Sequence, residues 1–447
     1  MSAKELVVLI NGLVVGTIEQ TGLGKFRFTY EEAYRRSDAA IPLSLSMPLT
    51  ANEHPHEIID PFIQGLLPDN DETLNQWGRR FGVSPRNPFA VLTHVGEDLS
   101  GAVQVVPPDK LEDLKRREGI TRLSEKTLKQ RFADLMRMPG ATQFTRDGGQ
   151  FSLAGAQRKK ALYLVNDKWY EPRGRTPSTH IVKPSIQDLP GQVENEMFCL
   201  RLARQIGLPA PRCWIEHFGE VRVIVVERYD RRRLVGKRVL PLDNAGGEVH
   251  RVHQEDCCQA LAIYPRTKYQ NEGGPGIAQI MALLSASGRP SEDRDRFLRA
   301  CAYNFIIVGT DAHAKNYSLL LARQGRFRLA PLYDIISWLP YSKDRRDNRL
   351  AMSVGGKYLV HEIMPRQWEA EAKSSGFDAT RALAHIRDVI AILPDEARSL
   401  FEQEVQDGAA TEELQNLMAL LTERCSQLAK TYGAEVMSDG QSRLPGF

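Results

Sequence analysis

The sequence predicts an α+β protein built from two lobes with a cleft between them. Three observations predict this arrangement: β-branched runs dominate the first half, helical periodicity dominates from about residue 254 onward, and polar loops lie where the halves meet. The chain has 447 residues, more than one ordinary hydrophobic core holds, so two or three domains are expected. A cleft between lobes is a common place for a ligand to bind.

Residues 1–108 are predicted to form an N-terminal β-rich subdomain. Residues 6–20 contain two β-branched runs joined by Asn11 and Gly12, the pair that best accepts positive φ at both positions of a hairpin turn. Residues 25–30 alternate in polarity, which predicts a third strand.

A connecting segment is predicted to follow. Within the first unit, residues 73–82 have helical spacing, and the unit ends at Pro107 and Pro108. Residues 109–148 are rich in charge and also have helical spacing, so we expect a helical connection there.

Residues 149–250 are predicted to form a second, sheet-rich lobe. Residues 150–165 have a strand–turn–strand pattern, and further strands are expected at 180–185 and 221–230. An amphipathic helix is expected at 193–207.

Residues 251–447 are predicted to form an all-helical C-terminal lobe. Its last helix, within 413–433, has Gly433 as its stop. The apolar residues on one face of this helix are Leu414, Leu417, Met418, Leu421, Cys425 and Leu428.

The composition is that of a globular protein with nearly balanced charge. It is 42% hydrophobic and 26% charged, and 59 basic against 56 acidic residues leave a net charge of +3. This balance does not by itself require a nucleic-acid partner. Two basic runs, Glu227–Arg238 and Lys343–Arg349, are more typical of solvated loops than of phosphate-facing surfaces, although both remain open.

The sequence predicts a cytoplasmic protein without a membrane partner. The apolar start is broken by Asn11 and Gly12, has no cleavage site of small residues, and no run of about 18 apolar residues occurs. The six cysteines show no C-x-x-C spacing, so we expect reduced core residues rather than disulfides or a zinc site.

The polar loop Gly309–Ser318 carries the first candidate site residues. Asp311 precedes Asn316 by five positions, and Asp334 follows in "LYDIIS". Phosphoryl transfer needs a carboxylate at the acceptor, and Mg²⁺ accepts one carboxylate and one amide oxygen together with phosphate oxygens. Protein kinases use the same Asp-x-x-x-x-Asn spacing. Alone the spacing is weak, since a turn rich in Asp and Asn before a strand has the same pattern.

Two further residues support the same chemistry. Lys183 ends the apolar run "HIVK", where a strand lysine would reach nucleotide phosphates, although a strand-edge charge is an equal alternative. Glu196 lies on the next amphipathic helix and could hold that lysine as an ion pair; the alternative is a solvent-facing carboxylate.

Two segments complete the set. "SLAGAQRK" (Ser152–Lys159) contains an Ala-Gly-Ala turn whose backbone N–H groups can approach phosphates, or which is a plain hairpin turn. "VVERYD" (Val225–Asp230) is an apolar strand that ends in polar residues, where a hinge would face adenine. The order of all these pieces along the chain is that of a kinase.

Together the motifs strongly resemble the HipA family, the serine/threonine kinase toxins of bacterial HipBA toxin–antitoxin systems. The resemblance covers nearly the whole chain and implies a two-lobed protein-kinase-like fold. It is carried by "SLAGAQRKKALYL", "PSTHIVKP", "ENEMFCLRLA", "VERYDR", "HQEDCCQAL", "KYQNEGGPGI", "GTDAHAKNYS" and "LYDIIS".

The resemblance implies a role for each matching position. Asp311 would be the catalytic residue, Ser152 the autophosphorylated serine, Glu196 the partner of the nucleotide lysine, and Asn316 and Asp334 the Mg²⁺ ligands. The residues implied in ATP binding are Ala154, Gly155, Ala156, Gln157, Arg158, Lys159, Lys183, Glu227, Arg228, Tyr229, His313, Ala314, Lys315, Asn316, Tyr333 and Asp334.

The resemblance also implies a target and partners. HipA toxins phosphorylate aminoacyl-tRNA synthetases, glutamyl-tRNA synthetase in the best-known case, which arrests growth in a drug-tolerant persister state. Their partner is a small HipB-like helix-turn-helix antitoxin, and the pair binds operator DNA. Phosphorylation of Ser152 would switch the kinase off, because it adds nearly two negative charges beside a loop that receives phosphates.

Two other functions were weighed against this one. A DNA-bound co-repressor with only structural nucleotide binding is disfavoured by the small net charge, since each phosphate contact needs a Lys or Arg. A metal-dependent hydrolase built on Asp311, His313 and Asp334 lacks further ligands. The roles of "HQEDCCQ" and the glycine-rich "NEGGPG" stay open; the first could be only a helix start, the second a loop near the protein substrate.

Overall fold

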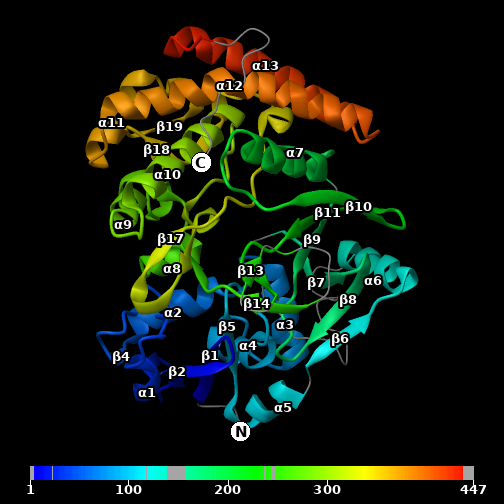
Figure 1. Ribbon diagram of the computed structural model, residues 1–447, viewed down its shortest axis with the longest axis vertical. Coiled ribbons are helices and arrows are strands. Elements are labelled where there is room, and N and C mark those ends of the chain that lie inside the picture. The colour runs from blue at the N-terminus through cyan, green and yellow to red at the C-terminus, as the bar shows by residue number, and fades with distance from the viewer. Residues whose placement is uncertain are drawn as a thin grey trace.

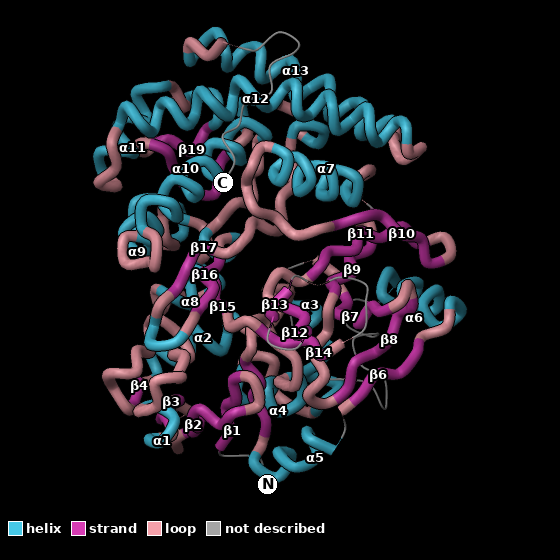
Figure 2. The backbone as a smooth tube through the Cα atoms, in the orientation of Figure 1, coloured by secondary structure: helices cyan, strands magenta, loops and turns pink. Residues whose placement is uncertain are grey.

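The computed structural model has strands gathered toward the N-terminal end and long helices at the opposite end (Figure 1). Figure 2 shows the same division, with helices α11 to α13 along one edge. Within the described residues, no helix is both long and apolar enough to cross a membrane. The structure describes residues 5–22, 24–116, 118–137, 157–186, 188–235, 238–240, 242 and 247–435.

The N-terminal unit (residues 5–106) is built on an antiparallel sheet. The predicted hairpin is confirmed, because Asn11 and Gly12 have φ of 50° and 77° and join the first two strands. The third predicted strand is also present. The sheet has the order β4-β3-β2-β1-β5, with β1 (Glu5–Ile10), β2 (Leu13–Gln20), β3 (Phe26–Tyr30), β4 (Glu53–His54) and β5 (Val103–Val106).

Four helices complete this unit around a core that includes Trp77 and Phe89. The predicted helix near residues 73–82 is confirmed as α3, which is capped by the Asn70 side chain and ends at the left-handed Gly82. The helices are α1 (Glu32–Arg35), α2 (His56–Gly65), α3 (Asp71–Phe81) and α4 (Pro88–Val95).

A second sheet forms the middle of the molecule. Helix α6 packs on it through Phe132, and helix α7 packs against its strands β10 and β11. Its order is β10-β11-β9-β7-β8-β6, with β6 (Gly119–Arg122), β7 (Lys160–Val165), β8 (Lys168–Arg173), β9 (His180–Pro184), β10 (Cys213–Phe218) and β11 (Val221–Glu227). The accompanying helices are α5 (Leu111–Arg116), α6 (Glu125–Arg137) and α7 (Gln192–Gln205).

The sequence predicts a helical connecting segment, but the structure contains a strand within it. Gly119 has φ of 138°, a value open mainly to glycine, and it interrupts the helical spacing. The next residues form β6, which pairs with β8 at the sheet edge. The strand predicted before the turn in 150–165 lies outside the described residues, whereas the strand after it is β7.

The C-terminal half contains long helices and also two small sheets. The predicted final helix is confirmed as α13, which ends at the left-handed Gly433. The strands differ from the all-helical expectation, because runs of three to six residues are too short to show a period. The helices are α8 (Cys257–Ala260), α9 (Ile277–Leu284), α10 (Pro290–Ile307), α11 (Pro365–Ser374), α12 (Ala379–Gln406) and α13 (Glu412–Tyr432).

The remaining elements are short. The sheets have the orders β13-β12-β14, β15-β16-β17 and β18-β19. Their strands are β12 (Arg231–Val235), β13 (Arg238–Leu240), β14 (Glu248–Arg251), β15 (Gln254–Asp256), β16 (Ser318–Leu321), β17 (Phe327–Leu329), β18 (Arg349–Val354) and β19 (Lys357–Leu359). The 3₁₀ turns are η1 (Pro108–Lys110), η2 (Pro265–Thr267), η3 (Gln270–Glu272), η4 (Ala314–Asn316), η5 (Arg323–Gly325), η6 (Leu339–Tyr341), η7 (Arg345–Asp347) and η8 (Val360–Glu362).

Helix α7 ties the middle sheet to the C-terminal helices. It packs on β10 and β11 on one side and on α12 and α13 on the other. Its buried residues Met197 and Phe198 therefore belong to the same hydrophobic core as Trp368 and Ile386. All six cysteines are buried free thiols.

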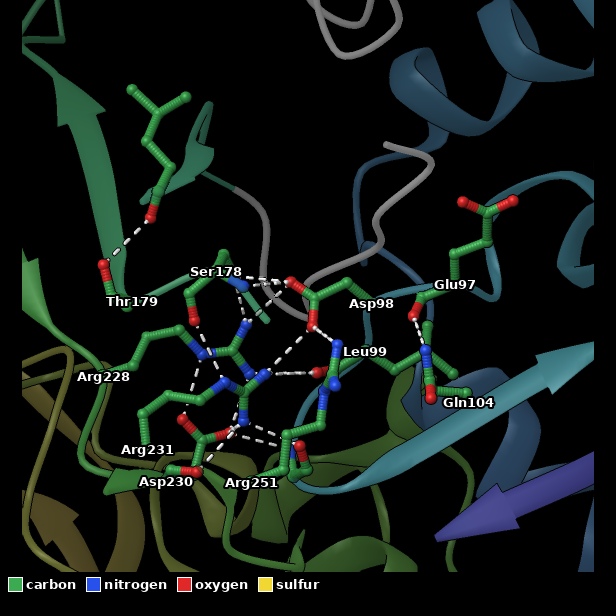
Figure 3. A network of polar contacts seen from close by, with 12 residues as sticks. Glu97, Asp98, Leu99, Gln104, Ser178, Thr179, Arg228, Asp230, Arg231 and Arg251 are labelled. Carbon is green, nitrogen blue, oxygen red and sulfur yellow. Dashed lines mark hydrogen bonds and ion pairs between the residues drawn. The ribbon is translucent and has the colours of Figure 1, made fainter. Parts of the chain in front are cut away.

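A buried network of charges joins the N-terminal unit to the middle sheet (Figure 3). The Asp98 carboxylate accepts hydrogen bonds from Ser178 Oγ at 2.5 Å and from Arg231 and Arg251 at 3.1 Å each. Arg228 donates to the same Ser178 hydroxyl and to Asp230. The basic run at 227–238 is therefore not simply a solvated loop, because Arg231 is 0% exposed and Arg228 is 3% exposed.

Candidate active site

A cavity of about 570 Å³ lies between the middle sheet, the C-terminal half and the N-terminal unit. This volume is within the usual range for small-molecule sites. Residues of β9, of the segment after β11 and of the loop between α10 and β16 line the cavity. The predicted site residues that line it are Gln157, Lys159, Lys183, Glu196, Glu227, Arg228, Tyr229, Asp311, His313, Lys315, Asn316, Tyr333 and Asp334.

The other predicted residues do not line this cavity or lie outside the described residues. The Arg158 guanidinium donates a hydrogen bond to the carbonyl of Met136, and Ala314 is buried in the main hydrophobic core. Those outside the described residues are Ser152, Ala154, Gly155 and Ala156.

Lys183 lies at the centre of the site. Strand β9 runs between β7 and β11 and places the lysine opposite Ile224. Its Nζ lies 2.7 Å from Glu196 Oε1 and 2.5 Å from Asp334 Oδ1. The structure thus brings together the lysine, the helix glutamate and the loop aspartate that the sequence had singled out separately.

Lys183 and Asp334 keep each other charged in a buried setting, whereas burial raises the pKa of Glu196. Burial opposes the charged form of Lys183, yet Asp334 and Glu196 raise its pKa above the ordinary value. Burial also opposes ionisation of Asp334, but Lys183 and Lys159 hold its pKa below the ordinary value.

The loop before β16 is held in shape by its own backbone. Helix α10 ends at Ile307, and the next residue, Val308, has a φ of 56° that is costly for a β-branched side chain. The His313 amide then donates to the Asp311 carbonyl at 2.8 Å, and the Asn316 side chain donates to the same oxygen at 2.7 Å. Asp311 and Asn316 are therefore fixed relative to each other without using the Asp311 carboxylate.

The Asp311 carboxylate faces the cavity. Its side chain is 55% exposed, and that surface opens onto the lined space. Partial removal of the carboxyl group from water raises the pKa of Asp311. Tyr269 donates its hydroxyl hydrogen to Asp311 Oδ1, so this tyrosine stands where a hydroxyl group would approach the carboxylate.

His313 is a neutral, packed residue of the loop. Burial lowers its pKa to about 3, so it carries no charge at neutral pH. Its ring meets the Tyr269 ring edge to face, with the centroids 5.0 Å apart. The structure thus gives His313 a packing contact beneath the Asp311–Tyr269 pair.

Asp311, Asn316 and Asp334 line a common small hollow at the edge of the main cavity. Asp334 has φ of 56°, a left-handed conformation that non-glycine residues rarely adopt, and such residues gather at functional sites. In the described part of the chain, no three His, Cys, Asp or Glu side chains are grouped to hold a metal. The donor set therefore fits Mg²⁺, which takes few protein oxygens, better than zinc.

The side chains of the predicted hinge, Val225–Asp230, make different contacts. Glu227 pairs with Arg212 at 2.7 Å, while the Arg228 guanidinium belongs to the Asp98 network (Figure 3). The Tyr229 ring lies 5.6 Å from the Tyr333 ring, centroid to centroid. The two tyrosines form an aromatic wall of the cavity, suitable for stacking with a flat base.

The cavity also contains residues that the sequence argument missed. Asp69 comes from the N-terminal unit, while Lys268 and Tyr269 belong to "KYQNEGGPGI". The spacing of residues within "KYQNEGGPGI" does not indicate that Tyr269 contacts Asp311, and the motif contributes to the sequence analysis only through the family resemblance. Asp69 lies in a stretch for which the sequence argument gave no signal.

Comparison with known families decides the identity of the chain. A model of the HipA-like C-terminal domain matches residues 151–397, and a model of the HipA N-terminal domain matches residues 6–106. The chain belongs to the HipA family. The resemblance predicted from the motifs is thereby confirmed.

Relatives and solved structures of the HipA family agree. The Sinorhizobium fredii protein named "Putative kinase Y4mE" is 36% identical over 384 residues, which cover 84% of this chain and 87% of that protein. The serine/threonine-protein kinase toxin HipA of Shewanella oneidensis is 26% identical over 386 residues, covering 83% of this chain and 82% of that protein.

A solved complex of Shewanella oneidensis HipA, HipB and operator DNA has the same fold. It matches with a TM-score of 0.79 at 23% identity and covers 97% of this chain and 100% of that chain. The two-lobed, kinase-like α+β fold is thus confirmed, and the names of the relatives place kinase activity at the level of the family.

Proposed function

We propose that this HipA-family chain is an ATP-dependent serine/threonine-protein kinase that acts as the toxin of a toxin–antitoxin system. The observation that carries the proposal is the meeting of Lys183, Glu196 and Asp334 in a cavity that also contains Asp311 and Asn316. More than a hundred positions separate Lys183 and Glu196 from Asp311, Asn316 and Asp334, and one cavity gathers both groups.

Each residue has a task that its position supports. Lys183 would hold nucleotide phosphates, and Glu196 would keep the lysine charged and in place. Asp334 and Asn316 would hold Mg²⁺ through their oxygens. Asp311 would orient and deprotonate the acceptor hydroxyl. Bound Mg²⁺-ATP would supply the transferable phosphoryl group.

The partners and the regulation are carried over from the family. We propose a HipB-like helix-turn-helix antitoxin as the restraining partner, with operator DNA bound through the pair; the fold shared with a HipA–HipB–DNA complex supports this. We propose an aminoacyl-tRNA synthetase, such as glutamyl-tRNA synthetase, as the substrate. Ser152 is proposed as the autophosphorylation site that switches the kinase off.

Phosphate transfer by the purified chain tests the catalytic proposal. With Mg²⁺ and labelled ATP, wild type should gain phosphate at Ser152, detected by mass spectrometry. Asp311→Asn should slow labelling by about 10²- to 10⁴-fold, since the loss of a general base has that range of effects. The assignment of Asp311 is wrong if both proteins are labelled equally.

Two further measurements separate toxin action from a co-repressor role. New phosphosites in a bacterial lysate incubated with the chain and Mg²⁺-ATP would identify the substrate. Expression of the wild-type chain in bacteria should arrest their growth, and expression of Asp334→Ala should not. Growth arrest that persists in Asp334→Ala, with operator binding retained, would favour the co-repressor.

A further inference from the structure

The motif "HQEDCCQAL" (residues 253–261) binds the N-terminal unit to the C-terminal half. His253 Nε2 lies 2.9 Å from the Leu43 carbonyl oxygen, and Glu255 accepts a hydrogen bond from the Leu45 amide at 2.8 Å. The Gln259 side chain donates to the Phe62 carbonyl at 3.0 Å. All three side chains are buried, so the motif is a docking site as well as a helix start.

Gln259 brings helix α2 unusually close. A Cβ atom on Gly65, the last residue of α2, would lie 2.7 Å from the Gln259 side chain, which only a glycine avoids. The chain then runs a few residues beyond α2 to Asp69, whose side chain is 11% exposed and lines the cavity. The docking contact therefore determines where Asp69 lies.

The two oxygens of Asp69 each hold one lysine of the C-terminal half. Lys315 Nζ lies 2.7 Å from Oδ1, and Lys268 Nζ lies 2.9 Å from Oδ2. Although burial opposes ionisation of Asp69, the two lysines lower its pKa. The arrangement is an ionised, buried triad and not a chance surface contact.

Both lysines belong to segments that contact or contain Asp311. Lys315 lies in the Asp311–Asn316 loop, and Lys268 immediately precedes Tyr269, which donates to Asp311. Among the residues that the structure describes, Asp69 is the carboxylate within ion-pair distance of both lysines. One side chain of the N-terminal unit thus ties together the two segments that surround Asp311.

We propose that Asp69 is a positioning residue of the active site, which it serves by holding Lys315 and Lys268 beside Asp311, and that the N-terminal unit is consequently part of the catalytic machinery. This proposal rests on the proposed kinase function. It gives "HQEDCCQAL" a task, namely to hold the N-terminal unit so that Asp69 reaches the cavity.

Asp69→Asn is the direct test, with Asp60→Asn as its matched control. Both replace a buried carboxylate of the same region, but Asp60 contacts Tyr264 and does not line the cavity. Asp69→Asn should lower the phosphate-transfer rate at saturating ATP by about 100-fold, the effect of misplaced groups. Asp69→Glu should recover part of that loss. Asp60→Asn should transfer at the wild-type rate. Because Asp69→Asn leaves two lysines without their carboxylate, it should lower the midpoint of thermal unfolding more than Asp60→Asn does, and all rates are therefore compared at a temperature at which every variant is folded.

A double variant shows whether Asp69 acts through Lys315. If it does, Asp69→Asn combined with Lys315→Met should be slower than Lys315→Met alone by less than about threefold, since the effects of coupled residues do not add. Full additivity would overturn the proposal. So would wild-type activity of Asp69→Asn, or a rate loss matched by Asp60→Asn.

Lysine labelling gives a readout that needs no nucleotide. In the protein without ATP, acetylation of Lys315 by an amine reagent should rise in Asp69→Asn, because the lysine ammonium loses the carboxylate that holds it, and stay unchanged in Asp60→Asn. If wild type transfers no phosphate, the proposed function fails, while the labelling still decides whether Asp69 holds the lysine. Unchanged labelling in Asp69→Asn would contradict the triad.

Discussion

Two of the contacts between the N-terminal unit and the rest of the chain use opposite electrostatic means. At Asp98 the contact joins ionised groups, and although burial opposes it, three arginines hold the pKa of Asp98 below its ordinary value. At Glu255 the contact joins neutral groups. Burial raises the pKa of Glu255 to about 8 and lowers that of His253 to about 4.

The difference shows how similar residues serve two purposes. The charges at Asp98 are paired within the protein, with Arg228 and Arg231 among the partners, and are used to fix the two parts together. The neutral contact leads instead to Asp69, whose charge is used in the cavity. We therefore expect changes at the first contact to act mainly on stability and changes at the second to depend on pH.

The largest expected effect is that of Asp98→Ala. It leaves buried guanidinium groups without their shared carboxylate and should lower the free energy of unfolding by about 3–5 kcal/mol. Urea unfolding measures this. The control is Glu19→Ala, which removes an exposed ion pair with Arg27 and should cost at most about 1 kcal/mol. Equal losses in the two variants would mean that the Asp98 network is not the stronger tie.

A pH-dependent effect is expected for Glu255→Gln. The folded-state pKa of Glu255 is raised to about 8 from an unfolded value near 4.5, so the folded wild type binds more protons than the unfolded chain within this window. Wild type should therefore lose stability relative to Glu255→Gln as the pH rises from about 5 to 8, by up to about 1.4 kcal/mol per pH unit. Thermal unfolding across this range checks it. Parallel stability curves would show that Glu255 is already ionised in the fold.

The smallest expected effect is that of Asp60→Asn at the same contact. Asp60 accepts hydrogen bonds from the Tyr264 hydroxyl at 3.1 Å and from the Gln64 side chain, and asparagine retains one of the two accepting oxygens. The free energy of unfolding should fall by about 1 kcal/mol or less, the net worth of one hydrogen bond. A loss as large as that of Asp98→Ala would remove the distinction between the two contacts.

The sequence was a good guide wherever structure is decided locally. The Asn11–Gly12 hairpin, helix α3 and helix α13 each carry their own turn or stop residue. The position of Lys183 at the end of an apolar strand and of Glu196 on the next helix also follow from local patterns. Such features need no knowledge of distant residues.

The sequence was a poor guide wherever a contact joins distant segments. The basic run that contains Arg231 is typical of a solvated loop, and its buried partner Asp98 lies 133 positions away. Asp69 was not noticed at all, because it meets Lys315 across 246 positions. Spacing within one segment cannot show such pairs, since only the folded chain brings them together.

Nucleotide binding tests the central claim most directly. Calorimetric titration of ATP with Mg²⁺ into wild type should show saturable binding, and Asp334→Asn should weaken it by about tenfold or more, as expected for the loss of one charged contact. The control Asp347→Asn changes an exposed aspartate outside the cavity and should bind as wild type does. Equal affinity of wild type and Asp334→Asn, or no binding by wild type, would contradict a nucleotide site that includes Lys183 and Asp334.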